Sequence, residues 1–464
     1  MKDFNCLLVH TPRLKKENGS IISLINYSAM GLFSLAGELV NDGFDTKILH
    51  LGVEKYLDKD FLLSDYIKKH SIKYAAFTLQ WCQQAYDVIE TTRAIKEKCP
   101  DVYITLGGYT ASFFAKEILE KFSHIDGIFK GESEVPTVKL ANALYNKKSL
   151  DGIPNLYWRK NGKIILNDGL YVAANEDLNR FEFFNSERML HYDEYSRISY
   201  ELDFEKENQL VTPSTSLNIC LGRGCMGNCV HCGGSHSASK LVSGRDFVSY
   251  RSAEKVISEM KLMQDKFGIN VFRFGFDPNN RDRSYFIDLF KKVKKEFSGK
   301  ITIMYDLEGL PDKKVIDAFK ECGNTDSILS ITPISYSEDL RRKYKSFFFT
   351  NKQLEEVLEY LELQKILSEL YFLGILGIKE SENTKSKEYG ESLAQRFNYV
   401  TASYYYDMEI VPASHWTLHP QKYNLKNFNT TFMEYYEENR GLKNSFESMD
   451  FCIRAEIDSV AKHQ

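Results

Sequence analysis

The chain has 464 residues, of which 43% are apolar, and this length predicts two or three domains that each bury a core. Basic and acidic residues are evenly spread, with a net charge of −4 and a pI near 6.3, which disfavours nucleic acids and anionic membranes as partners. No apolar run approaches the ~18 residues of a membrane span. The apolar start is too short for a secretion signal, so we expect a cytoplasmic protein.

Residues 1–150 alternate short apolar runs with amphipathic stretches, which predicts βα units around a doubly wound parallel sheet. Five strands are expected, at 4–12, 44–52, 72–80, 102–108 and 125–132. Four helices are expected, at 28–42, 85–98, 112–122 and 134–147. Ligands of such sheets bind outside the carboxyl ends of the strands, so the turns after the last three strands would share one rim.

These turns hold the candidate ligand-binding residues of the first domain. They are Thr78, Gln80 and Trp81 after the third strand, Gly107 and Gly108 after the fourth, and Gly131 and Glu132 after the fifth. Each glycine can equally serve only to make a tight strand-to-helix turn. Because three such turns fall on one rim, we interpret them together as the border of a ligand groove.

Residues 151–212 break the βα pattern. Two runs in which apolar and polar residues alternate flank Asn161 and Gly162, a pair typical of a two-residue hairpin turn. The charged and aromatic stretch that follows is interpreted as a connector to a second domain.

Units of the βα kind resume over residues 213–410. Strands are expected at 215–223, 269–276, 300–308, 327–335, 369–378 and 401–412, and helices at 252–267, 284–297, 313–323, 351–366 and 386–397. Six strands of this kind predict a partial or full barrel whose active face is the carboxyl rim. Residues 411–464 would form a small C-terminal extension that caps the substrate.

Four of the nine cysteines lie within residues 220–236, in the loop after the first barrel strand. Cys225, Cys229 and Cys232 have the spacing C-x3-C-x2-C, and in a reducing compartment such a group indicates a metal site rather than disulfides. Three thiolates leave one iron of a four-iron cube open to a ligand, whereas a structural zinc, the alternative, needs a fourth protein ligand. Cys220 is interpreted as a spare, buried thiol.

This loop, placed after the first strand of a βα barrel, resembles that of the radical S-adenosylmethionine (SAM) superfamily. In that family the loop holds a [4Fe-4S] cluster, and the fourth iron binds the amine and carboxylate of SAM. Further segments are similar to members that carry a front cobalamin domain: 272–283, 331–344 and 369–381 in the barrel, and 30–52, 101–111 and 126–144 in the front domain.

The resemblance implies an α/β architecture: a Rossmann-like cobalamin-type domain, a radical SAM partial (β/α)6 TIM-like barrel and the C-terminal extension. It implies an enzyme that makes a 5′-deoxyadenosyl radical and, with cobalamin, methylates an unactivated carbon of a small molecule or peptide. An electron donor such as flavodoxin or ferredoxin would reduce the cluster. The alternatives are a cobalamin-free radical dehydratase, epimerase or rearrangement enzyme, and a structural metal-binding protein.

The resemblance also suggests roles for single residues. Asp277, Ser335 and Arg341 match positions that would contact SAM, although Arg341 can equally be a solvated residue at a helix start. His231, inside the cysteine loop, is a further candidate cofactor contact. If cobalamin is bound, Trp81 would lie against its lower face and no side chain would ligate cobalt.

Two residues near the end of the last strand are candidates for catalysis. Glu409 and His415 lie among aromatic side chains where a barrel substrate would bind, and such a pair could hold a polar substrate or move a proton. His415 can equally be a hydrogen-bonded residue of the rim. With the two rims facing each other, Trp81, Glu409 and His415 would share one chamber.

Overall fold

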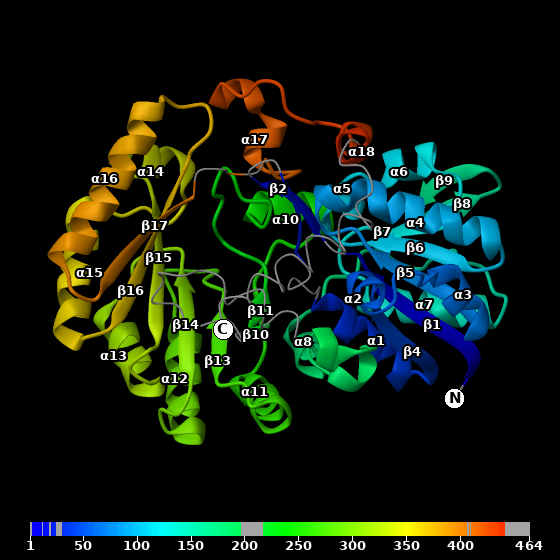
Figure 1. Cartoon of the computed structure of the whole chain (residues 1–464), viewed down its shortest axis with the longest axis horizontal. Helices are drawn as coiled ribbons and strands as arrows, with labels where there is room; N and C mark the ends of the chain where they lie inside the picture. The colour runs from blue at the N-terminus through cyan, green and yellow to red at the C-terminus, as the bar shows by residue number, and fades with distance from the viewer. Residues whose placement is uncertain are drawn as a thin grey trace.

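The structure is a computed structural model that describes residues 2–11, 13–17, 20–24, 30–195, 217–405, 408 and 410–440. Figure 1 shows a blue-to-cyan α/β unit beside a green-to-orange one, and a red C-terminal helix that returns to the first unit. We call these the front unit and the barrel unit. Within the described ranges, no helix combines the length and the apolar character needed to cross a membrane.

The front unit is built on a seven-stranded sheet with the order β4-β1-β5-β6-β7-β8-β9. Its first five strands are parallel, as predicted, and are rich in buried aliphatic side chains because helices cover both faces. They are β1 Lys2–His10, β4 Phe44–His50, β5 Ile72–Thr78, β6 Tyr103–Gly107 and β7 Gly127–Phe129. The covering elements are α1 Gly31–Asn41, α2 Leu51–Leu57, α3 Leu63–Lys69, η1 Cys82–Gln84, α4 Ala85–Lys98, α5 Tyr109–Phe113, α6 Ala115–Lys121 and α7 Glu134–Tyr145.

The predicted hairpin is confirmed and belongs to the front sheet. It consists of β8 Leu156–Lys160 and β9 Lys163–Leu166, joined by Asn161 and Gly162 with positive φ angles of 50° and 75°. Because β8 pairs antiparallel with β7, the front sheet extends past the predicted boundary at residue 150. A second hairpin, β2 Arg13–Glu17 with β3 Ser20–Leu24, was not predicted. The short elements α8 Asn175–Arg180 and η2 Ser186–Arg188 follow the front sheet.

The barrel unit has the six predicted strands, all parallel, in the order β10-β13-β14-β15-β16-β17. They are β10 Leu217–Asn218, β13 Val271–Phe274, β14 Thr302–Leu307, β15 Ile328–Ile334, β16 Leu367–Leu373 and β17 Val400–Tyr405. The helices are α10 His236–Ser243, α11 Ala253–Phe267, α12 Ser284–Phe297, α13 Lys313–Cys322, α14 Glu338–Tyr344, α15 Asn351–Gln364 and α16 Glu380–Arg396. Ser252, Asp312 and Thr350 cap the starts of α11, α13 and α15.

The first barrel strand is shorter than predicted. The chain leaves the barrel after Asn218 and forms a separate antiparallel pair, β11 Gly222–Arg223 with β12 Ser249–Tyr250. This pairing requires glycine, because a Cβ at Gly222 would lie 2.3 Å from the Ser249 carbonyl oxygen. The cysteine loop therefore begins and ends on a small ribbon of its own.

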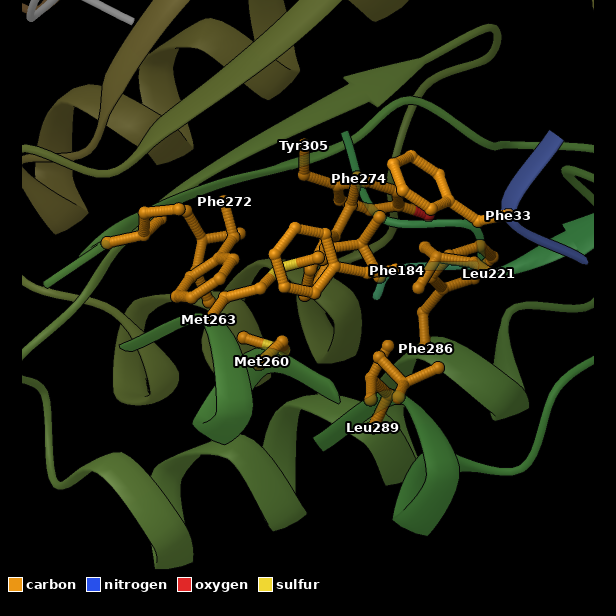
Figure 2. Packing of buried hydrophobic residues seen from close by; sticks show 14 of the residues in the cluster. Phe33, Phe184, Leu221, Met260, Met263, Phe272, Phe274, Phe286, Leu289 and Tyr305 are labelled. Carbon is orange, nitrogen blue, oxygen red and sulfur yellow. The ribbon is translucent and has the colours of Figure 1, made fainter. Parts of the chain in front are cut away.

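Side chains alternate between two faces along the barrel strands. Phe272 and Phe274 of β13 point toward α11 and α12, where they pack with Met260, Met263, Phe286 and Leu289 (Figure 2). The same core continues to Phe33 of the front unit, so the two units share buried apolar surface. The residues between the helix-facing ones point to the opposite face of the sheet, which we call the lumen face.

The C-terminal segment passes from the barrel to the front unit. It contains α17 His415–Leu418, η3 Pro420–Tyr423 and α18 Phe432–Arg440. The Glu117 carboxylate of α6 accepts the backbone N–H of Phe432 at 3.0 Å and that of Met433 at 3.2 Å, and so caps α18. The Tyr436 hydroxyl donates to Glu90 of α4 at 2.7 Å. The extension therefore connects the two units as well as following the last strand.

We expect the substitution Phe274→Ala to lower the free energy of unfolding by about 3–5 kcal/mol, because it leaves a cavity in the shared core. Phe274 is fully buried, and its ring stacks on Phe290 with an interplanar angle of 5°. Urea unfolding followed by tryptophan fluorescence measures the change. Leu363→Ala, at a side chain that is 74% exposed, is the control and should change stability little. Equal effects of the two substitutions would contradict this account of the core.

Candidate active site

The three cysteines of the loop are held by backbone hydrogen bonds to their sulfurs. Cys225 Sγ accepts from Gly227 N at 3.2 Å, Cys229 Sγ from Ser346 N at 3.4 Å, and Cys232 Sγ from Gly234 N at 3.3 Å. Backbone donors to sulfur are one of the means by which proteins tune iron–sulfur clusters. The donor set and its hydrogen bonds therefore fit a cluster bound through these three thiolates.

The surroundings of the loop change the pKa values of two of its cysteines. Burial, with a contribution from neighbouring thiols, raises the pKa of Cys225 to about 11 and that of Cys232 to about 12. Thiols in such surroundings stay protonated at neutral pH unless a metal compensates the thiolate charge. In the described part of the chain, no three His, Cys, Asp or Glu side chains gather closely enough to hold a single metal ion.

Cys220 lies outside this group, as predicted. It is 9% exposed and packs in a small apolar cluster with Ala173, Leu178, Phe181 and Phe183. Burial raises the pKa of its thiol. The structure thus gives Cys220 the surroundings of a packing residue.

A charged pair that the sequence analysis missed lies beside the cysteine loop. Lys345, which is buried, donates to Glu308 at 2.6 Å, and the Glu308 side chain is 46% exposed. Lys345 lowers the pKa of Glu308, while burial drives that of His231 down to about 4, so His231 is neutral at physiological pH. The only signal for this pair in the sequence was the position of Glu308, a carboxylate directly after the third barrel strand.

The predicted SAM contacts have partners within the protein. The Asp277 carboxylate accepts from Arg283 at 3.0 and 2.8 Å and from the backbone N–H of Glu308 at 2.8 Å. Ser335 lies 3.1 Å from Ser386, Oγ to Oγ. Arg341 is fully buried, which excludes the solvated alternative, and it donates to the carbonyls of Pro333, Ser335 and Phe349. These residues hold the rim loops together, and their contact with SAM stays a prediction.

The fourth-strand turn of the front unit faces the cysteine loop. The Tyr109 hydroxyl donates to the Pro412 carbonyl at 2.9 Å, and a side chain at Gly233 would meet Val411 at 2.6 Å and the Tyr109 hydroxyl at 3.1 Å. Gly107 has open space where a Cβ would be. Gly108, with φ of 100°, is required by the turn itself, because its Cβ would lie 2.9 Å from the Leu79 carbonyl oxygen. The predicted facing of the two rims is thus present.

The third-strand turn combines predicted and unpredicted residues. Thr78 Oγ1 lies 2.9 Å from His10 Nδ1, and the His10 ring lies 6.3 Å from that of Trp81 and 4.9 Å from that of His50. The sequence analysis missed the two histidines, although β1 and β4 both end in one. They lie next to the point where the strand order reverses, between β1 and β5, which is where sheets of this type bind ligands.

Gln80 makes hydrogen bonds within the front unit, and its contact with a cofactor stays a prediction. Its Oε1 accepts the Tyr109 backbone N–H at 3.1 Å, and its carbonyl accepts the Thr110 hydroxyl at 3.0 Å. These bonds tie the third-strand turn to the start of α5. Gln80 therefore supports the rim, and Trp81 beside it is half-buried.

Gly131 and Glu132 correct the predicted ligand groove, because the barrel unit fills the space beside them. A Cβ at Gly131 would lie 2.8 Å from the Ser243 backbone at the end of α10. Glu132 Oε1 accepts from Arg245 Nε at 2.6 Å, and Oε2 accepts from Arg245 and Arg223, each at 3.0 Å. Buried arginines need such partners, so this turn serves as a docking site for the barrel unit.

Glu134 completes this junction. It accepts a hydrogen bond from Arg223 and one from Ser34 of α1 at 3.0 Å. Burial acts to raise the pKa of the Glu134 carboxyl, but Arg223 outweighs it, and the pKa is lowered. The carboxylate is therefore ionised and paired between the units. We call Glu132, Glu134, Arg223 and Arg245 the junction.

The two candidates at the end of the last strand are partly described. His415 Nε2 lies 3.1 Å from the Ser237 hydroxyl of α10, directly after the cysteine loop. Trp416 is fully buried, and its ring centroid lies 6.0 Å from that of His231. Glu409 lies outside the described residues. The structure thus brings His415 to the edge of the cysteine loop, and its catalytic role stays a prediction.

Comparisons with known proteins agree with this geometry. The sequence pattern of the radical SAM superfamily matches residues 219–384, which include the cysteine loop and most of the barrel. Those residues form a radical SAM domain. The chain is 25% identical over 267 residues to an uncharacterized methyltransferase of Pyrococcus horikoshii, covering 58% of this chain and 52% of that protein. It is 23% identical over 294 residues to cytidylyl-2-hydroxyethylphosphonate methyltransferase of Streptomyces wedmorensis, covering 57% and 54%.

Solved structures share the arrangement of both units. The methyltransferase TsrM of Kitasatospora setae, with cobalamin and a [4Fe-4S] cluster bound, matches with a TM-score of 0.65 at 16% identity, over 89% of this chain and 74% of that one. OxsB, with aqua-cobalamin and SAM bound, matches with a TM-score of 0.63 at 14% identity, over 97% and 56%. The chain spans about half the length of the curated relatives from Pyrococcus horikoshii and Streptomyces wedmorensis. The predicted fold, a Rossmann-like unit before a radical SAM barrel, is confirmed.

We expect alanine at Cys225, Cys229 or Cys232 to abolish the cluster of the radical SAM domain, because two thiolates cannot hold it. Iron and sulfide content and the charge-transfer absorbance after anaerobic reconstitution measure this. Cys220→Ala is the matched control and should keep full iron content. A triple variant that kept its iron, or a Cys220→Ala protein without iron, would contradict the assignment.

We expect Glu132→Gln to lower the free energy of unfolding by about 3 kcal/mol, because it leaves the buried Arg245 without its carboxylate and leaves Arg223 with Glu134 alone. Urea unfolding measures the loss, and faster proteolysis between the units should accompany it. Glu176→Gln, at an exposed position of α8, is the control. Unchanged stability of the Glu132→Gln protein would show that the junction does not hold the units together.

Proposed function

We propose that the protein is a cobalamin-dependent radical SAM methyltransferase that acts on an unactivated carbon of a small molecule or peptide. The single observation that carries the proposal is the facing of the two rims: Tyr109 of the front unit contacts Pro412 and lies against Gly233, next to Cys232. A cofactor on the front rim would therefore lie next to a cluster bound by the cysteine loop. When bound, the cluster and SAM would supply a 5′-deoxyadenosyl radical, and cobalamin would supply the methyl group.

The chain's own residues would position these groups and exclude water. Gly227, Ser346 and Gly234 donate backbone N–H groups to the cysteine sulfurs and so fix the loop. Glu308 presents a half-exposed carboxylate beside the same loop, where the polar end of SAM would lie, and the buried Lys345 holds that carboxylate in place. Tyr109 and Val411 close one side of the space, which protects a reactive intermediate from solvent.

For cobalamin the available surface is the third-strand and fourth-strand part of the front rim. Gly107 faces open space, and Trp81 is half-exposed beside the strand-order reversal between β1 and β5. The fifth-strand turn is excluded, because the barrel unit occupies it. A substitution at Gly108 would disturb the turn whether or not cobalamin binds, so Gly107 is the better position to test.

We expect the protein, purified without oxygen and with hydroxocobalamin supplied, to retain corrinoid at near-unit stoichiometry. Trp81→Ala should weaken retention and shift the cobalt absorbance, and Gly107→Leu should abolish retention while iron content stays unchanged. Trp158→Phe, in the β8–β9 hairpin, is the control. Cleavage of SAM to 5′-deoxyadenosine without any bound corrinoid would replace the proposal by a cobalamin-free radical enzyme. Failure to bind iron would leave a structural metal protein.

A further inference from the structure

The lumen face of the barrel sheet carries a polar floor where barrels of this type usually carry branched apolar residues. Asp306, Ser330, Glu369 and Thr401 are register partners on four neighbouring strands, β14 to β17, and therefore form one layer. Arg273 of β13 joins this layer through its side chain, which bonds to Asp306. Phe272 and Phe274, which precede and follow Arg273 in β13, point to the opposite side of the sheet, toward the helices (Figure 2).

The charged groups of the floor hold one another in place. Arg273 donates to Asp306 through Nε at 2.7 Å and through Nη2 at 3.2 Å, which leaves Nη1 without a partner among the described residues. Glu369 accepts from the Tyr371 hydroxyl at 2.5 Å and from the Ser403 hydroxyl at 2.8 Å. The three charged side chains of the floor are thus held by hydrogen bonds within the protein.

The open part of the floor is the Arg273–Asp306 pair, whereas Glu369 is 4% exposed and Ser330 is fully buried behind it. The side chains of Arg273 and Asp306 are 37% and 27% exposed. Burial nevertheless raises the pKa of Asp306. For Arg273, burial is the largest single influence and acts to lower the pKa, but the charge of Asp306 and its hydrogen bond together outweigh burial, so the pKa is raised. Both side chains are therefore partly exposed and also partly desolvated by the protein around them.

Ser330 adds an independent sign of a missing ligand. It lies between Asp306 and Glu369 in register and is fully buried. Its hydroxyl is close enough to Asp306 to lower the pKa of that carboxyl, but its oxygen makes no hydrogen bond of acceptable geometry in the described structure. A buried hydroxyl without a good partner is costly, and a polar ligand group would satisfy it.

The balance of charge indicates which ligand group fits. The floor has two carboxylates, Asp306 and Glu369, for one cation, Arg273, whose Nε and Nη2 both bond to Asp306. A second anion would be repelled by the carboxylates, whereas a protonated amine would compensate the excess negative charge. Nη1 of Arg273 and the Ser330 hydroxyl can bond to a neutral oxygen of the same ligand.

We propose that this floor is the substrate subsite and that the substrate carries a protonated amine next to a neutral oxygen, as an amino alcohol does. The inference rests on the proposed function for the identity of the ligand as substrate. The same lumen face leads to the cysteine loop. Asp306 lies in β14, and Glu308 follows two residues later, directly after the strand. Glu308 in turn lies close enough to Cys225 and Cys232 to influence their thiols. An amine held at the floor would place the rest of the substrate toward the cluster.

The test compares three matched probes, benzylamine, benzyl alcohol and benzoate, by saturation-transfer NMR on the cluster-loaded protein. S-adenosylhomocysteine is present throughout so that the amine site of SAM is filled. We expect benzylamine to bind roughly tenfold tighter than benzoate, as one charge-assisted hydrogen bond would give. Glu369→Gln should remove this preference. Arg273→Gln, which deletes the only cation of the floor, should increase it. Glu359→Gln, at an exposed position of α15, is the control and should keep it.

Each outcome supports or overturns one statement. Equal or tighter binding of benzoate to the unsubstituted protein, or an unchanged preference in both Glu369→Gln and Arg273→Gln, would overturn the amine subsite. The readout needs no turnover, so it is separate from the proposed function. A protein that prefers benzylamine but neither cleaves SAM nor retains cobalamin would overturn the proposed function and leave the subsite in place.

Discussion

The arrangement of this protein depends on the junction, in which two glutamates of one front-unit turn pair with two arginines that flank the cysteine loop. Arg223 lies just before the loop and Arg245 just after α10, so both ends of the cluster-binding segment are fixed to the front unit. Such pairs are costly to desolvate, and they stabilise a structure only when every donor and acceptor is satisfied. Here the Ala173 carbonyl and the Ser249 hydroxyl accept the remaining Arg245 donors, at 2.6 and 3.0 Å, whereas Glu134 Oε2 is buried without a hydrogen bond among the described residues.

Once the junction is formed, the other contacts between the units follow from it. Gly131 can approach Ser243 because it has no side chain, and this approach brings Tyr109 to Pro412 and Gly233. The C-terminal segment then returns to the front unit, where α18 is capped by Glu117. The space between the rims is therefore bounded by elements from three distant parts of the sequence, as a site for radical chemistry requires if water is to be excluded.

The barrel contributes two polar regions with different characters. Near the rim, Glu308 and Lys345 form a balanced ion pair beside the cysteines. Deeper on the lumen face, Arg273, Asp306 and Glu369 form an unbalanced group with an excess of negative charge. The exposed Glu308 carboxylate of the first region suits the amine of a cofactor, whereas the second region is the subsite proposed for a substrate amine. The strands thus separate the two ligands along one face of the sheet.

The sequence by itself determined the alternation of strands and helices, the Asn161–Gly162 hairpin and the buried Cys220, because each depends on local spacing or on a short motif. The three cysteines of the loop were picked out by the same kind of motif, and their binding of a cluster stays a prediction. It could not determine what Gly131 and Glu132 face, because identical turns border a ligand in one protein and a second domain in another. It also passed over Arg273, Asp306 and Glu369, since single charged residues within apolar strands show no pattern until neighbouring strands are in register. Tertiary structure decided these points, because strand pairing and domain docking join residues that are distant in the chain.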